Sequence, residues 1–246
     1  MKSPHAIRLK TSYMKKRILL EPLTKPSLLS VIKRVAIRLA AEDRKESDAS
    51  YQPGEVYYEE YIIKILPLVI NNSSRHLSEL FELDLRNRNG EFYNCCVLTI
   101  AAFTNHIPII KSLMAEVRAS RRSKLYKHLY LKWDHRYDCQ EDFRIALGNP
   151  ITVAMTAGNL QVLRILLHNA RFGEKLIDWQ FPRTTREGHS EVVQFIINSK
   201  YRPWDEEIDV SDRYKYKNTF FKCLITPSMD ILESLLNFIK NPCKLC

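Results

Sequence analysis

The chain has 246 residues, of which 45% are hydrophobic and 27% charged, and this composition is typical of a globular protein rather than a disordered or collagen-like one. It holds 6 glycines, too few for a β-sandwich with its frequent turns, so the helix formers in its apolar stretches favour an all-α fold. The net charge of +10 favours acidic proteins, nucleic acid or anionic lipid as partners.

The apolar segments do not predict a membrane span. The most apolar window, Ile62–Ile70, is much shorter than the roughly 20 residues that a span needs, and it contains Lys64 and Pro67. The basic N-terminal residues are not followed by the apolar region of a secretory signal. We therefore expect a cytoplasmic or nuclear protein whose 6 cysteines are reduced.

The N-terminal quarter predicts an arm followed by a helical cap. Residues 1–17 are rich in lysine and are expected to form a basic flexible arm. Residues 18–55 are assigned to a cap and linker, because apolar and basic residues occupy opposite faces of a helix over Leu28–Ala41. Residues 42–55 are polar and contain Pro53-Gly54, which predicts a loop. Whether residues 58–69 and 77–83 form a further, degenerate helix pair stays open.

The rest of the chain contains an internal repeat. Its clearest copy is residues 149–167, NPITVAMTAGNLQVLRILL. The same frame recovers residues 97–106 with the apolar pairs that follow them, residues 184–197, and residues 219–228 with Ile231-Leu232 and Leu235-Leu236. Each copy predicts two packed helices, since paired apolar residues recur four positions apart. We expect Gly158 and Gly188 to end a first helix in the left-handed conformation. Asn105 and Pro227 occupy the same slot.

These copies resemble the ankyrin-repeat pattern TPLHxAAxxGHxxVVxxLL, and the chain is similar to divergent members of that family. The resemblance implies a solenoid of stacked helix pairs with irregular hairpin loops over residues 56–240, followed by a C-terminal tail at 241–246. The first alanine slot recurs after 53, 30 and 39 residues, against an ankyrin period of about 33. We therefore expect a long insertion at about 118–147. The Thr and His slots of TPLH hold other residues, such as Asn149 and Thr152 or Cys96 and Thr99, which puts in doubt the hydrogen bonds of regular units.

The resemblance implies that a partner binds along the concave face and the projecting loops, so we interpret the chain as a non-enzymatic scaffold or adaptor for an acidic or mixed-charge protein. The candidate partner-binding residues are Phe103, Thr104, Tyr126, Tyr130, Trp133, Arg136, Arg183, Arg186, Glu187 and Lys222. They include the aromatic and arginine side chains that often dominate binding energies. The sequence does not predict the oligomeric state.

Residues 118–136 support an alternative, because cations interleaved with aromatic rings can neutralise phosphates and stack on bases. The module would bind nucleic acid through this segment and the N-terminal arm, with Arg118, Arg121, Arg122, Lys124, Lys127 and Lys132 as contacts. A purely structural interpretation is that the aromatic residues of this insertion pack it against the solenoid. Catalysis, a cofactor and a metal are not expected: Cys243-Lys-Leu-Cys246 lacks the further ligands that zinc requires. His106 and His189 fall in the structural Gly-His slot of the pattern.

Overall fold

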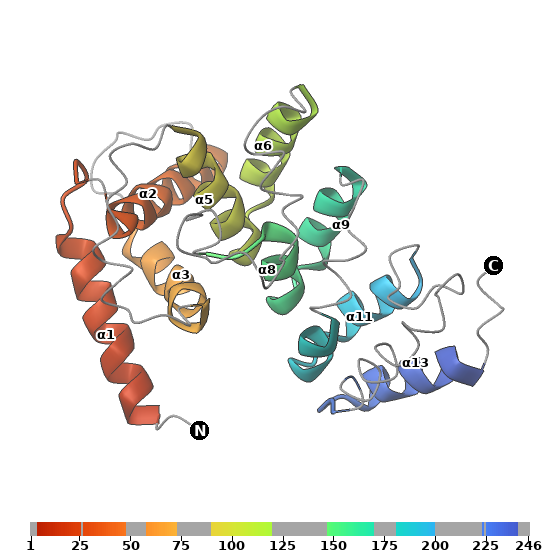
Figure 1. Ribbon diagram of the computed structural model, residues 1–246. Helices are drawn as coiled ribbons and strands as arrows, with labels where there is room; N and C mark the ends of the chain where they lie inside the picture. Colours follow the sequence, from red (N-terminus) through yellow and green to blue (C-terminus); the bar gives the residue numbers. More distant parts are fainter. Residues whose placement is uncertain are drawn as a thin grey trace, which may run out of the picture. The chain divides into compact units, whose positions relative to one another are not determined.

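The computed structural model describes residues 4–25, 27–47, 58–72, 90–119, 147–169, 181–199, 223 and 225–240, and every element in these ranges is a helix (Figure 1). The predicted all-α class is confirmed for this part of the chain. The chain divides into two compact units. The described part of the first contains α1 (Pro4–Leu20), α2 (Leu28–Ser47), α3 (Glu59–Asn72), α5 (Gly90–Phe103), α6 (Ile107–Ala119) and residues 147–149. The second contains α8 (Pro150–Thr156), α9 (Leu160–Asn169), α11 (Ser190–Ile197) and α13 (Met229–Lys240).

The prediction of a flexible arm is wrong for residues 4–17, because they form most of helix α1. Met14 and Ile18 lie one turn apart on this helix and are completely buried where α1 packs on α2 and α3. Lys15 also forms an ion pair with Glu59 of α3, with 3.1 Å between Nζ and Oε2. Burial of two large apolar side chains offsets the cost of ordering a strongly basic segment.

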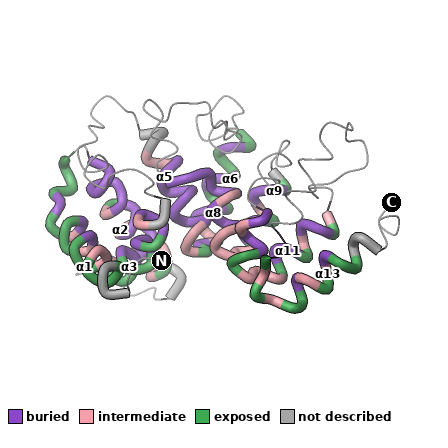
Figure 2. Tube along the Cα trace, turned by 60° about the horizontal axis from the view of Figure 1, so that its bottom comes forward, coloured by how far each residue is buried: buried purple, intermediate pink, exposed green. Residues whose placement is uncertain are grey.

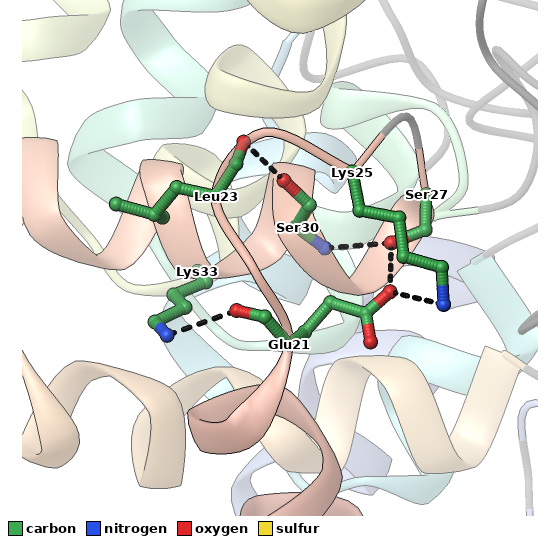
Figure 3. Close-up of polar contacts among 6 residues, drawn as sticks. All are labelled: Glu21, Leu23, Lys25, Ser27, Ser30 and Lys33. Atoms are coloured by element: carbon green, nitrogen blue, oxygen red, sulfur yellow. Dashed lines mark hydrogen bonds and ion pairs between the residues drawn. The ribbon is translucent and has the colours of Figure 1, made fainter.

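The link between α1 and α2 is held by a polar cluster around Glu21, whose side chain is buried (Figure 3). Ser27 donates to Glu21 Oε1 at 2.5 Å, and Lys25 Nζ lies 3.0 Å from the same oxygen. The Ser27 hydroxyl also accepts the backbone N–H of Ser30, so it caps the first turn of α2. Lys33 Nζ donates to the carbonyls of Leu19 and Glu21, which satisfies the C-terminal end of α1.

The predicted capping helix is present as α2, and it is longer than expected. Its apolar face is buried as the pattern predicted, with Val31, Ile32, Val35 and Leu39 in the core of the first unit. The helix continues to Ser47, so residues 42–47 of the predicted loop are helical, while residues 48–55 lie outside the described ranges. The first predicted helix of the degenerate pair is α3, and residues 77–83 are likewise outside the described part.

The first three repeat copies contain the expected pairs of helices. They are α5 with α6, α8 with α9, and residues 181–186 with α11. The residue two positions before the start of each second helix takes the left-handed conformation, with φ of 59° at Asn105, 74° at Gly158 and 81° at Gly188. The prediction for both glycines is thus confirmed. The paired apolar residues of the second helices are buried: Ile109, Ile110, Leu113 and Met114 in α6, Val162, Leu163, Leu166 and Leu167 in α9, and Val192, Val193, Ile196 and Ile197 in α11.

The fourth copy departs from this geometry. Pro227 occupies the slot of the left-handed residue, but the proline ring holds φ near about −65°. The turn is instead capped by Ser228, whose hydroxyl accepts the backbone N–H of Ile231 at 3.4 Å. In α13 Ile231 and Leu235 are buried, whereas Leu236, the second residue of its pair, is exposed. Figure 2 shows the mixed burial along α13. The predicted tail at 241–246 lies outside the described residues.

Candidate partner-binding surface

The turns of the second unit stack on one another through side-chain hydrogen bonds. His189 Nε2 lies 2.9 Å from the carbonyl oxygen of Thr156, one turn back in the array. Thr226 then donates its hydroxyl to the carbonyl of Thr185 at 2.9 Å. We call residues 156–158, 186–189 and 225–227 the turn strip. These bonds hold three successive turns in a fixed order, which is the scaffold that a binding surface needs.

The turn strip presents charges of both signs next to aliphatic surface. Arg186 and Glu187 are exposed, and Glu187 lies 3.7 Å from the Nε of half-buried Arg183. Ile225, at the last turn of the strip, is 69% exposed. An ion pair this open to water contributes little to folding, so these side chains are available to a partner.

Six of the predicted site residues lie in the described part of the chain. Arg183, Arg186 and Glu187 are together in the second unit. Phe103 and Thr104 lie in the first unit at the end of α5, where both are half-buried, and the Thr104 hydroxyl donates to Ile100 of its own helix. Arg118 is exposed in the last turn of α6. The remaining predicted residues are outside the described ranges: Arg121, Arg122, Lys124, Tyr126, Lys127, Tyr130, Lys132, Trp133, Arg136 and Lys222.

Ile225 is exposed but was not among the residues that the sequence predicted for the partner-binding surface. No local pattern in the sequence indicates its exposure. His189 was assigned a structural role, and its bond to Thr156 agrees with that assignment.

The His slot of the repeat retains a hydrogen bond in spite of its substitution. Thr99, which stands in that slot, donates its hydroxyl to the carbonyl of Gly148 at 3.1 Å, and the bond is buried. It joins α5 to the residues before the next copy. A shorter side chain at this position therefore still makes a buried hydrogen bond between segments.

His106 has a structural position as well. Its Nδ1 lies 3.5 Å from the backbone N–H of Ile109, in the first turn of α6, and the ring is buried. Its Nε2 is 2.9 Å from Asp43 Oδ1 of α2, within ion-pair distance, although the carboxylate lies outside the direction for a hydrogen bond. Both contacts are within the first unit, so His106 links the end of α2 to a turn rather than facing a ligand.

Comparisons with protein-family models, curated proteins and solved structures find no match to this chain. Among the residues that the structure describes, no group of three or more His, Cys, Asp or Glu side chains could hold a metal ion. None of the helices in the described ranges is long and apolar enough to cross a membrane.

Two of the three described cysteines are poor nucleophiles. Cys95, Cys96 and Cys223 are buried free thiols. Burial raises the pKa of Cys96 far above its ordinary value, and the neighbouring Cys95 raises it further. Burial also raises the pKa of Cys223 to about 12, although a hydrogen bond with Thr185 and the charge of Arg186 act in the opposite direction. Because the thiolate is the reactive form, neither sulfur is activated for catalysis.

We expect Cys96 and Cys223 to resist alkylation by iodoacetamide at pH 8 in the native protein. Their modification should follow the rate of unfolding, since burial both excludes the reagent and suppresses the thiolate. Peptide mapping by mass spectrometry reports each cysteine separately, and the same reaction in denaturant is the control in which both are modified. Native-state labelling of Cys223 as fast as that of a small free thiol would contradict this prediction.

Proposed function

We propose that this chain is a divergent ankyrin-repeat solenoid with a non-enzymatic function, the binding of a protein partner along its turns. The observation that carries the proposal is the repeated unit of two helices joined by a left-handed residue, at Asn105, Gly158 and Gly188. Repetition of one turn geometry places equivalent side chains at regular intervals, which is how solenoid proteins form extended binding surfaces.

The chemistry of the turn strip supports a protein partner. Arg186 and Glu187 offer complementary charges, and exposed Ile225 offers aliphatic surface to bury. A partner with acidic groups would also be attracted by the net charge of +10, which accelerates encounter more than it sets final affinity. Burial raises the pKa of both Cys96 and Cys223, which suppresses the reactive thiolate forms.

The proposal is tested by quantitative affinity capture with the full-length chain and an Arg186→Glu variant. We expect recovery of a specific protein to fall about tenfold in the variant, which corresponds to about 1.4 kcal/mol of binding free energy. Lys111→Glu is the matched control, because Lys111 is an exposed residue of α6 and the change in charge is the same. Binding of the identified partner is then measured with purified proteins.

Equal recovery by the wild type and the Arg186→Glu variant would contradict a role for the turn strip. The same proteins are incubated with RNA and DNA over a series of salt concentrations. Tight binding that weakens steeply with salt, without any captured protein, would favour the nucleic-acid function predicted for residues 118–136. The structure does not describe that basic segment beyond Ala119, so this alternative depends on the sequence.

A further inference from the structure

Helix α1 carries a second surface that the proposed scaffold function does not use. Its inner face is buried through Met14 and Ile18, yet large apolar side chains also lie on the opposite face. Leu9, Tyr13 and Leu20 are 60%, 55% and 70% exposed. Spacings of four and seven residues place all three on one stripe of the helix, on the side opposite the buried Met14 and Ile18. Figure 2 shows exposed residues along α1.

Basic residues accompany this apolar stripe, and no acidic residue is present in α1. Lys16 lies within the stripe, between Tyr13 and Leu20, and the neighbouring Arg8 and Arg17 are exposed. Glu59 pairs with Lys15, and Glu21 pairs with Lys25 and is also attracted by the charge of Arg17. The outer face therefore combines exposed apolar side chains with the positive charges of Arg8 and Lys16, a combination that marks an interaction surface.

We propose that this outer face of α1 binds an anionic lipid bilayer, with Leu9, Tyr13 and Leu20 inserted at the interface and the cations beside the headgroups. A bilayer surface satisfies both features at once, because it buries apolar side chains and attracts lysine and arginine. Nucleic acid would satisfy the charges and leave the three apolar side chains in water.

The packing of α1 also favours a flat ligand. A protein groove encloses much of a bound helix, but the inner half of α1 is already covered by α2 and α3. What remains is a strip about 25 Å long, given 17 residues at about 1.5 Å each. Such a strip lies parallel to a membrane plane without rearrangement of the first unit. The inference adds a membrane-surface site and does not require the proposed protein partner.

The test is co-sedimentation of the full chain with vesicles of phosphatidylcholine, with or without phosphatidylserine, at low and high salt. We expect binding to the anionic vesicles that weakens with salt. Leu9→Ser combined with Leu20→Ser should weaken it at least tenfold, because the inserted side chains are removed. Lys16→Glu should weaken it more than fivefold, since each basic residue near the surface is worth about that factor. Both substitutions are at exposed positions, so the thermal unfolding temperature should not change.

Matched controls separate this face from general apolar or charged surface. Ile63→Ser combined with Met229→Ser removes two other exposed apolar side chains, and Lys111→Glu makes the same change in charge on α6. Both controls should bind as the wild type does. Absence of binding to the anionic vesicles, or equal loss in the variants and their controls, would overturn the proposal. The proposal would also be overturned if the α1 variants lost binding to RNA, or to a captured acidic protein, while vesicle binding was unchanged.

Discussion

Gly158→Ala is expected to lower the free energy of unfolding by about 2–4 kcal/mol. At φ of 74° an alanine side chain costs about 1–2 kcal/mol, because Cβ crowds the following carbonyl oxygen. An added Cβ would also stand 2.5 Å from His189 Nδ1. The His189 ring cannot simply rotate away, since its other nitrogen is bonded to the carbonyl of Thr156, and losing that bond costs about 1 kcal/mol more. Equilibrium unfolding in urea measures the change.

Gly188→Ala provides the control for the backbone effect. This glycine also has a positive φ, 81°, but an added Cβ would meet Pro227 Cγ at 3.5 Å, which is ordinary contact. We expect a loss of about 1–2 kcal/mol. The additional loss of stability in Gly158→Ala, relative to Gly188→Ala, should disappear when His189 is also replaced by alanine. A double-mutant cycle measures this coupling. Equal costs for the two alanine variants would refute the packing of His189 against Gly158.

Glu21→Gln is expected to cost about 1–3 kcal/mol at neutral pH, because the charged partner of Lys25 is removed from a buried cluster. Burial alone would raise the pKa of Glu21. Hydrogen bonds with Ser27 and Lys25, together with the charges of Lys25 and Arg17, outweigh burial and hold this pKa below its ordinary value. The ionised carboxylate is thus favoured in the folded state, and the cluster in Figure 3 depends on it.

This lowered pKa gives the effect a definite dependence on pH. The folded state binds the proton less readily than the unfolded state, whose carboxyl titrates near about 4.3. The stabilisation is therefore present above that value and is lost as the pH falls through the folded-state pKa. The difference in the free energy of unfolding between the wild type and Glu21→Gln should become smaller below about pH 4.3. Glu59→Gln, at an exposed ion pair, is the control and should change stability by less than about 1 kcal/mol. If the difference in the free energy of unfolding stayed constant or grew at acidic pH, the lowered pKa of Glu21 would be contradicted.

Local patterns in the sequence predicted much of the helical framework. The paired apolar residues of α6, α9 and α11 are buried, and Gly158 and Gly188 adopt the left-handed conformation. These features are determined within one repeat, since each depends on residues a few positions apart. The fourth repeat copy departs from this pattern at Pro227, because proline cannot adopt a positive φ. The following helix is capped by Ser228 instead.

The surface of the turn strip was predicted in part. Arg186 and Glu187 are exposed next to Arg183, as expected for adjacent residues in one turn. The exposure of Ile225 was not predicted, because it depends on turns about 40 residues earlier in the chain, including the bond from Thr226 to Thr185. The same long separation explains why Thr99 could not be paired with Gly148 in advance, as the two are 49 positions apart in the sequence.

Short-range patterns were enough to predict the helices of the described ranges and their repeated pairing, because periodicity and turn residues act over a few positions. Other features depend on contacts between distant segments. A lysine-rich N-terminal segment forms helix α1 because α2 and α3 bury Met14 and Ile18, and the pKa of Glu21 is held below its ordinary value because Ser27 and Lys25 contact its carboxylate. Those contacts join separate elements, so they stabilise the protein only once the helices have packed. They therefore leave no periodic pattern in the sequence from which they could be predicted.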